Sequence, residues 1–411
     1  MRSREDDIPT YHHAWFAANH QDYTWRYPWQ TETKQTVQED QGRQISREVW
    51  DQICWYYNHQ THRQAWERIR DLVLTMHNRP VMSYWGGGGS WGHAVVPYST
   101  QVAGDEYRVT IYDNNNPYRE SENNGPDPNV AIVHWAANTF GYGGGDKMIC
   151  LSYDEGRQTP VHLPADAVGG AGGNMVVGVF NKGAQVAQIE DGEGHRFFNA
   201  DGSINTDPAT RIPDSMKYVP LMGGPPPDDY PDMFIFNRAG GKNLSFNVSG
   251  TGQKLCRFFM PGDVFEVQAA GQGQIILQNI LTNQRGLQIP NPGALQLLSI
   301  QSIKVLTFDR GYLLNNFRNL GANKLLLLSK ADGNSLDIES NGALQCNLLL
   351  SSFAGGKAVQ GSFSNIELAA NSRATLRPPT WTNLATGELG LQLRNLQDNQ
   401  LIRDTKLPPG Q

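Results

Sequence analysis

The chain has 411 residues, of which 39% are hydrophobic and 18% charged, and it carries a net charge of −6 at pH 7. A chain of this length can bury two or three cores, and its composition lies far from that of a disordered protein. The basic residues form no run along the sequence. Nucleic acid is therefore not expected as a partner, because binding to phosphates needs a concentrated positive patch.

The sequence shows no membrane-spanning or targeting segment. No apolar run approaches the length of a membrane span, and the first residues, "MRSREDDIPTYHHAW", lack the apolar centre of a signal peptide. We therefore expect a soluble protein without a membrane span. The compartment stays open, and of the alternatives an extracellular one is favoured.

The first forty residues are aromatic and polar without a clear periodicity, as in "YHHAWFAANHQDYTWRYPWQ". Tryptophan and tyrosine side chains are costly to leave in water. We therefore expect residues 1–44 to form an extended arm that lies on another surface, either of the same chain or of a neighbouring copy. In the second case the arm would join a homo-oligomer.

Two helices are predicted after the arm. The segment "SREVWDQICWYYNHQ" has Ser46 as an N-cap and the acidic residue Glu48 in its first turn. In "HRQAWERIRDLVLTMHN" the apolar residues recur at helical spacing, and Pro80 ends the pattern. The apolar face of this second helix consists of Ala65, Trp66, Ile69, Leu72, Val73 and Met76.

Three short strands are predicted next. They are "PVMSYW" at 80–85, "HAVVPYST" at 93–100 and "EYRVTIYD" at 106–113. The turn "QVAGD" between the last two predicts a hairpin. This hairpin places the start of one strand beside the end of the other, so His93 and Asp113, which are 20 positions apart, are expected to meet.

A histidine and an aspartate so placed are two of the three groups of a cysteine-peptidase site. Such a site needs a thiolate, a histidine within hydrogen-bond distance of it, and an amide or carboxylate that orients the histidine. The segment "RQAWERIRDLVLTMHNRPVMSYWGGGGSWGHAVVPYSTQVAGDEYRVTIYDNNNP" resembles the histidine-containing part of papain-like, bacteriocin-processing-peptidase-like domains. The resemblance rests on the pieces "GHAVV" and "IYDNNNP" in this order. It implies that His93 is the catalytic base and that Asp113 orients it.

The nucleophile that the resemblance implies has no clear match. In such domains a cysteine lies upstream, in a Gly-rich turn that opens a long helix, and nothing of this kind precedes His93. The upstream cysteine is Cys54, 39 residues before the histidine, and it stays a candidate nucleophile. It falls about two turns inside the predicted helix, where the helix dipole hardly lowers the pKa of a thiol. Either the front half of the site is lost, or the thiol comes from elsewhere, or the domain no longer catalyses.

Other interpretations of these residues stay open. His93 can cap a strand by bonding to the backbone, and "DNNNP" can be a turn in which Asn and Asp bond to their own backbone. The stretch from Asp113 to Asp127 offers many oxygens to Ca²⁺, but its spacing matches no EF-hand loop. The four cysteines include no CxxC pair, which indicates buried thiols rather than zinc ligands. No cofactor and no metal is predicted.

The clearest boundary is "LMGGPPPDDYPDM" at 221–233, where Gly, Pro and Asp exclude a helix or a central strand. We expect a papain-like domain over 45–221, a Pro/Gly linker over 222–232 and a second, independently packed domain over 233–411. The last segment shows short alternating runs such as "VFEVQAAG" and "NLLLSSF", separated by Gly, Asn or Asp. This pattern is typical of an antiparallel all-β sandwich. Weak self-similarity leaves a β-solenoid as the alternative.

The predicted class is therefore α+β, a papain-like domain of helices and an antiparallel sheet followed by an all-β sandwich. The predicted function is that of a papain-like cysteine peptidase or related acyl transferase, with an incomplete or degenerate site of His93, Asp113 and Cys54. The alternative is a non-catalytic binding or structural protein built from a degenerate peptidase domain and a β-sandwich. In either case the expected substrate or partner is a protein or a peptide.

Overall fold

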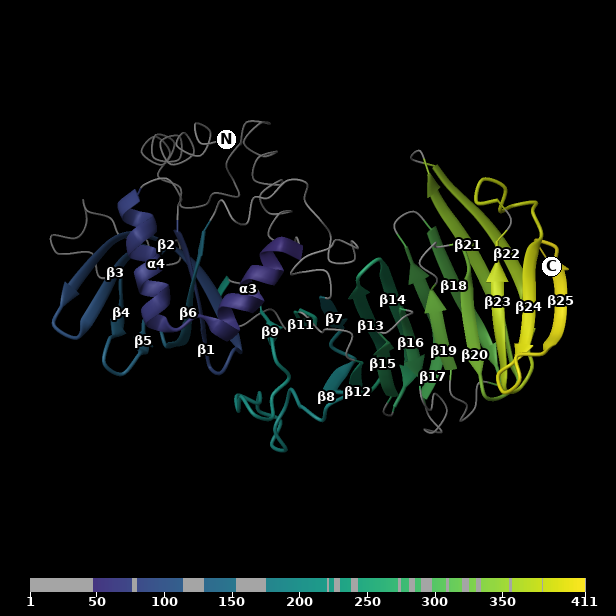
Figure 1. Ribbon diagram of the computed structural model, residues 1–411, viewed down its shortest axis with the longest axis horizontal. Coiled ribbons are helices and arrows are strands. Elements are labelled where there is room, and N and C mark those ends of the chain that lie inside the picture. Colours follow the sequence, from purple (N-terminus) through teal and green to yellow (C-terminus); the bar gives the residue numbers. More distant parts are fainter. Residues whose placement is uncertain are drawn as a thin grey trace.

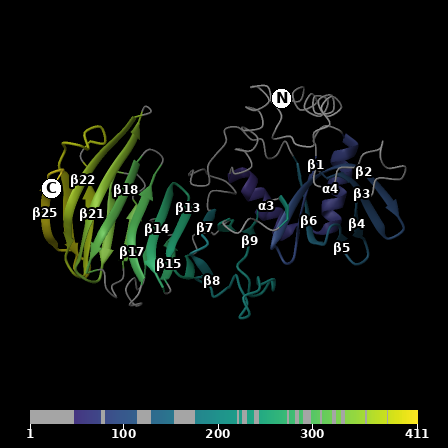
Figure 2. The same ribbon diagram turned by 180° about the vertical axis from the view of Figure 1, so that it is seen from behind.

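The computed structural model describes residues 47–75, 80–113, 129–152, 175–219, 222–224, 230–237, 243–272, 275–280, 285–289, 298–307, 310–319, 325–329, 334–354, 357–378 and 380–410. They form two units that lie side by side (Figures 1 and 2). The N-terminal unit comprises the described residues from 47 to 152, and the sandwich begins at 176. The predicted arm over residues 1–44 lies outside the described residues.

The N-terminal unit consists of two helices and an antiparallel sheet. The helices are α3 (Arg47–His59) and α4 (His62–Thr75). In the sheet the strands follow the order β5-β4-β3-β2-β1-β6. Their bounds are β1 (Pro80–Gly86), β2 (Trp91–Ala103), β3 (Glu106–Tyr112), β4 (Val130–His134), β5 (Thr139–Gly141) and β6 (Gly145–Ser152). Both predicted helices and the predicted hairpin of β2 and β3 are confirmed.

The two helices cover opposite faces of this sheet. Because neighbouring side chains of a strand point to opposite faces, Tyr84 and Trp85 of β1 join two different buried clusters. The inner cluster contains the buried side of α4, and the shared cluster contains the buried side of α3. The inner cluster consists of Ala65, Trp66, Ile69, Met82, Tyr84, Val95, Val109, Ile111, Ala131, Val133, Phe140, Met148 and Cys150. The shared cluster consists of Trp50, Ile53, Cys54, Trp85, Ile149, Met175, Val177, Met216, Val219, Met233 and Ile235.

The described chain is β-rich, which corrects the expected α+β class. After Thr75 the described residues form strands, turns and irregular segments but no further helix. Gly, Asn and Pro are frequent in this part of the sequence, and they weaken helices and favour turns. The helices α3 and α4 are thus the whole helical content of the described residues, and antiparallel sheets dominate both units. This β-rich arrangement does not fit the expected papain-like domain of helices and sheet over 45–221. Neither described helix is long and apolar enough to cross a membrane.

The sandwich consists of two nine-stranded antiparallel sheets. Buried and half-buried residues alternate along its strands, as they do in β13 and β14. One sheet has the order β22-β21-β18-β17-β14-β13-β7-β11-β9, and the other has the order β25-β24-β23-β20-β19-β16-β15-β12-β8. The bounds are β7 (Val176–Phe180), β8 (Gln185–Asp191), β9 (Ser215–Tyr218), β11 (Asp232–Phe236), β12 (Leu244–Ser249), β13 (Gln253–Met260), β14 (Asp263–Gly271), β15 (Ile275–Ile280), β16 (Arg285–Ile289), β17 (Leu298–Leu306), β18 (Arg310–Arg318), β19 (Leu325–Ser329), β20 (Leu336–Ser340), β21 (Leu344–Ala354), β22 (Lys357–Leu368), β23 (Ser372–Arg377), β24 (Leu389–Asn395) and β25 (Leu401–Leu407).

Hairpins of the sandwich alternate between its two sheets. The hairpins β13–β14, β17–β18 and β21–β22 lie in one sheet, and β15–β16, β19–β20 and β23–β24 lie in the other. In the first sheet these hairpins begin at Gln253, Leu298 and Leu344, at steps of 45 and 46 residues. The two packed sheets correspond to the predicted sandwich. The regular period corresponds to the self-similarity of the sequence, for which a β-solenoid was the alternative interpretation.

The sandwich begins upstream of the predicted linker. Strands β7 and β8, at 176–191, already belong to its two sheets. Strand β10 (Met222–Gly224), inside the predicted linker, returns to the N-terminal unit and pairs with β2. Pro225–Pro227, on which the predicted boundary was centred, lie outside the described residues. The chain therefore passes between the units more than once.

The two units also share buried side chains. In the shared cluster, Trp50 and Trp85 from the N-terminal unit pack with Val177 and Ile235 of the sandwich. Strands β7, β11 and β9 lie together at one end of a sandwich sheet, and α3 packs on β9 and β11. The strands β7 and β11 therefore carry apolar side chains on both faces: one face packs in the core of the sandwich and the other in the shared cluster.

Candidate functional site

His93 and Asp113 meet at the junction of β2 and β3. The register pairs Val96 of β2 with Tyr112 of β3, so the end of β3 lies beside the start of β2. Nε2 of His93 lies 2.8 Å from Oδ1 of Asp113. The two residues are 3% and 5% exposed. The structure thus brings together the two residues that the hairpin predicts.

Two further polar residues complete the group. The hydroxyl of Tyr142 donates to Oδ2 of Asp113 at 2.9 Å, and it lies 3.1 Å from the side-chain oxygen of Asn129. Asn129 directly precedes β4, and Tyr142 directly follows β5. The sequence carries no motif that would have identified either residue, because both come to the site through pairing of strands distant from His93.

The second ring nitrogen of His93, Nδ1, is buried and has no hydrogen-bond partner among the described residues. The ring meets the ring of Tyr84 edge to face, with centroids 5.6 Å apart. Burial, together with the charge of Asp113, raises the pKa of Tyr84 above its ordinary value, so this tyrosine stays neutral. With Nε2 held by the carboxylate, Nδ1 is the nitrogen on which a proton could be exchanged with a reacting group.

The strand β10 covers the backbone edge at His93. Met222 pairs with His93, and Gly224 pairs with Gly92. On its other edge the same part of β2 pairs with β1. The backbone of β2 is therefore paired on both sides where the histidine stands.

Cys54 lies elsewhere. It is the eighth residue of α3, and its Sγ lies 3.2 Å from the backbone oxygen of Asp214, to which the thiol donates. The residue has no exposed surface. Burial, the main cause, and the charge of Asp214 raise the pKa of Cys54 well above its ordinary value. The thiol is therefore protonated and bonded to the backbone.

The sheet separates Cys54 from His93. Cys54 packs with Trp85 in the shared cluster, whereas His93 pairs with Tyr84, whose side chain belongs to the inner cluster. Residues directly opposite in an antiparallel pair point to the same face. The thiol and the imidazole are thus on opposite faces of the sheet.

The other cysteines do not supply a nucleophile at His93. All of them are described and buried. The Sγ of Cys150 contacts the backbone oxygen of Leu151, and burial raises the pKa of Cys256 and of Cys346 to about 12 inside the sandwich core. None of the four thiols has His93 as its partner.

A second histidine–carboxylate group lies in the turn after β8. Asp191, Glu193 and His195 hold ligand-type atoms within 4.8 Å of one another. Burial raises the pKa of Asp191, but hydrogen bonds from His195 and Glu193 outweigh it and hold this pKa below its ordinary value. Oδ1 of Asp191 accepts hydrogen bonds from the backbone N–H groups of Glu193 and His195. These bonds stabilise the turn, and they explain why the three side chains lie close together. The oxygen-rich stretch considered for Ca²⁺ falls largely on residues 114–128, outside the described residues.

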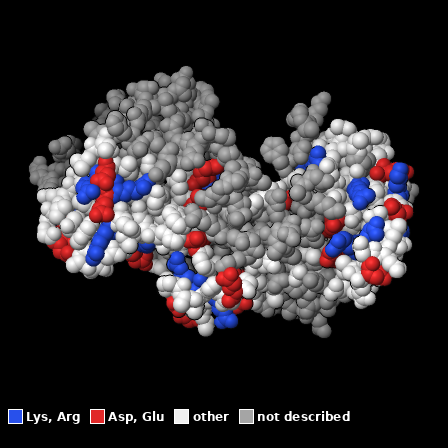
Figure 3. Space-filling model, in the orientation of Figure 1, with Lys and Arg blue, Asp and Glu red and all other residues white. Residues whose placement is uncertain are grey.

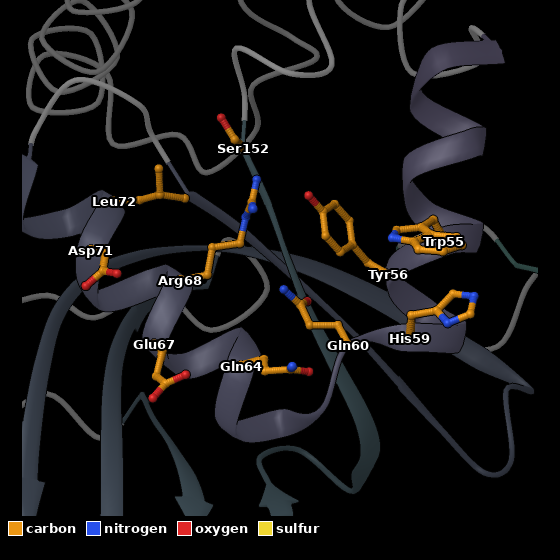
Figure 4. Close-up of a pocket in the computed structure, with 10 residues that line it drawn as sticks. All are labelled: Trp55, Tyr56, His59, Gln60, Gln64, Glu67, Arg68, Asp71, Leu72 and Ser152. Carbon is orange, nitrogen blue, oxygen red and sulfur yellow. The ribbon is translucent and has the colours of Figure 1, made fainter. Parts of the chain in front are cut away.

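A cleft of 660 Å³ opens between α3 and α4 (Figure 4). The guanidinium carbon of Arg68 lies 4.9 Å from the ring centre of Tyr56 within it. On the face seen in Figure 3, Lys and Arg side chains lie among Asp and Glu side chains, without a large area of one sign. The cleft is lined by Trp55, Tyr56, His59, Gln60, Gln64, Glu67, Arg68, Asp71, Leu72 and Ser152, a set that contains none of the three predicted site residues.

Gln60, in the turn between the helices, closes the outer edge of β6. Its Oε1 accepts the N–H of Cys150 at 2.8 Å, and its backbone oxygen accepts a hydrogen bond from Nζ of Lys147 at 2.8 Å. Burial, with the charge of Arg211 as a second cause, lowers the pKa of Lys147 to about 8. This lysine therefore loses its proton at a pH at which the free energy of unfolding can be measured.

We expect Lys147 to contribute a rise of stability with pH above about 8. The buried thiols of Cys54, Cys256 and Cys346 oppose this rise, because their raised pKa values let the unfolded chain lose these protons first. The pKa of Lys147 in the folded chain, about 8, lies below its ordinary value of 10.5, so between these values the unfolded chain binds more protons at this lysine. Urea unfolding between about pH 8 and pH 9.5, below the usual pKa of tyrosine, measures this slope. Lys147→Met should make the slope less positive, or more negative, than in the parent chain, whereas Lys182→Met, at an exposed turn position, should leave it unchanged. An unchanged slope in Lys147→Met would show that this lysine is not the cause.

Comparisons with known proteins find no match: no family model, no curated protein and no solved structure is significantly similar to this chain. The arrangement around His93 is therefore interpreted from its own geometry.

Proposed function

We propose that the chain is a non-catalytic binding or structural protein, in which a degenerate peptidase-type hairpin is joined to a β-sandwich. The observation that carries the proposal is the position of Cys54. Its thiol is buried, is bonded to Asp214 and lies on the opposite face of the sheet from His93. A cysteine nucleophile needs a lowered pKa and contact with the histidine. The expected partner is a protein or a peptide.

The burial of the His93 group also supports this proposal. The imidazole and the carboxylate are almost fully enclosed, and Tyr142 and Asn129 tie them to the strands β4 and β5. The group joins the ends of several strands, as a structural hydrogen-bond network does. Its role would then be to fix the hairpin rather than to transfer a proton.

A papain-like cysteine peptidase, or a related acyl transferase, is the second candidate. One observation favours it: Asp113 bonds Nε2, and within the described part of the chain Nδ1 of His93 has no hydrogen-bond partner. This is the arrangement in which a base is oriented by one nitrogen and acts through the other. The candidate needs a thiol that reaches Nδ1, and Cys54 would have to leave its helix position to supply it.

Labelling with a thiol-reactive peptidase probe distinguishes the two candidates. We expect no adduct on Cys54 when the native chain is treated with a vinyl sulfone or epoxysuccinyl probe and digested for mass spectrometry. Iodoacetamide in urea should modify all four cysteines and serves as the control for detection. An adduct on Cys54 in the native chain that disappears in His93→Ala would establish the peptidase reading and end the proposal.

A further inference from the structure

The N-terminal unit has an apolar face that no described helix covers. Val96 of β2 and Tyr112 of β3 are register partners and are 45% and 54% exposed. Their neighbours Val95 and Ile111 belong to the inner cluster, so Val96 and Tyr112 point to the opposite face. Tyr98, beside the bulge in β2, is also exposed.

The same face continues on β4. Ala131 and Val133 belong to the inner cluster, so Val130 and Ile132 lie on the opposite face, where both are half-buried. The outer face, as we call it, thus contains Val96, Tyr98, Tyr112, Val130 and Ile132. An antiparallel sheet that faced water on this side would carry polar residues at these positions. The polar residues Thr110 and Arg108 of β3 lie opposite Val130 and Ile132. The apolar residues at the start of β2, at the end of β3 and on β4 indicate that this part of the sheet is covered.

Neither of the two described helices covers the outer face. Helix α4 packs on the inner side of the sheet, against β1, β2, β4 and β6. Helix α3 lies on the same side of the sheet as the outer face but packs against β6, β9 and β11, away from β3 and β4. The cover must therefore come from outside the described residues or from another molecule.

The segment that enters α3 has the composition and the reach for this role. It runs into α3 at Arg47, on the side of the sheet to which Trp85 and the outer face both point. An extended segment spans about 3.3 Å per residue, whereas neighbouring strands are only about 4.8 Å apart. By contrast, residues 114–128 contain one aromatic side chain, that of Tyr118. The aromatic residues of the segment 11–30 are Tyr11, Trp15, Phe16, Tyr23, Trp25, Tyr27 and Trp29.

We propose that residues 11–30 cover the outer face of the same chain, with their aromatic side chains against Val96 and Tyr112. Aromatic side chains contribute large buried area and a polar tip that can stay in water, which suits a segment lying across a sheet. Val96, Tyr112 and Ile132 would then belong to a second apolar core, formed between the outer face and residues 11–30, in addition to the inner cluster on the other face of the sheet. This inference does not depend on whether His93 catalyses.

Photocrosslinking in the full-length chain tests the proposal. The photoreactive residue p-benzoylphenylalanine is placed at Tyr112, and in a second variant at Val96. A mixture of ¹⁵N-labelled and unlabelled chains distinguishes crosslinks within one chain from those between chains. We expect crosslinked peptides from residues 11–30 within one chain at both positions. The same residue at Leu401, which is 52% exposed on β25, is the matched control and should not crosslink to 11–30.

Four outcomes would overturn the proposal. They are crosslinks between a ¹⁵N-labelled and an unlabelled chain, which would make a second copy the occupant; crosslinks only to residues 114–128 or 153–174; no crosslink at either position; and equal crosslinking from Leu401. Because the readout is a position in the chain, the result is independent of the thiol-labelling test at Cys54.

Discussion

Replacing Trp85 by alanine is expected to lower the free energy of unfolding by about 3–5 kcal/mol, the usual loss when a buried aromatic side chain is truncated. Trp85 is fully buried, and the ring of Tyr57 meets it edge to face with centroids 5.2 Å apart. It belongs to the shared cluster, in which Val177 and Ile235 come from the sandwich. The loss should therefore be felt by both units and not only by the one that contains Trp85.

Urea unfolding followed by two signals measures this effect. Far-UV circular dichroism reports mainly on the strands of the sandwich, and the remaining tryptophans report mainly on the N-terminal unit. The two transitions should coincide and shift together in Trp85→Ala. Leu401→Ala, at an exposed position, should change stability by no more than about 0.5 kcal/mol. A sandwich transition that stays in place would contradict the importance of the shared cluster.

Replacing Asp113 by alanine is expected to cost about 2–6 kcal/mol, because His93 and Tyr142 each lose their acceptor, at about 1–3 kcal/mol for each unsatisfied group. The carboxylate holds His93 through one oxygen and Tyr142 through the other. Thermal or urea unfolding of the variant measures the loss. Groups kept for catalysis often reduce stability, so a variant that is as stable as the parent chain, or more stable, would favour the peptidase reading of the site.

Tyr142→Phe is the matched control for this experiment. It removes one hydrogen bond to Asp113 and keeps the ring, so the expected loss is about 1 kcal/mol. Because Tyr142 and Asp113 touch, the double variant should lose less than the two single losses together. If the loss in the double variant equals the sum of the two single losses, the hydrogen bond between Tyr142 and Asp113 contributes no interaction energy to stability.

Local patterns in the sequence were sufficient for the parts of the fold that are local. The helical spacing of Ala65, Trp66 and Ile69 corresponds to the buried side of α4, and the turn before Glu106 corresponds to the hairpin of β2 and β3. The meeting of His93 and Asp113 followed from that hairpin alone. The alternating runs after Met233 correspond to strands of the sandwich for the same reason, since alternation is a property of each strand by itself.

What the sequence did not reveal depends on pairing between distant segments. Asn129 and Tyr142 reach Asp113 only because β4 and β5 follow β3 in the sheet. Glycine and proline around 222–224 indicate a linker, and nothing local in this segment shows that its backbone pairs with β2 at His93. Val177 and Ile235 appear as ordinary strand residues, although their outward side chains meet α3. Such pairings are decided by the whole fold rather than by local preference.

The alternation of hairpins between the two sheets has a consequence for the length of the molecule. Each step of 45 or 46 residues adds one hairpin to the first sheet, and the intervening hairpin adds two strands to the other. At about 4.8 Å per strand, one step extends the sandwich by about 10 Å. A new hairpin pairs with the preceding hairpin of its own sheet, so whole steps can be gained or lost without rethreading the chain. The number of such steps thus sets the length of the sandwich and with it the distance between Leu407 and the helices.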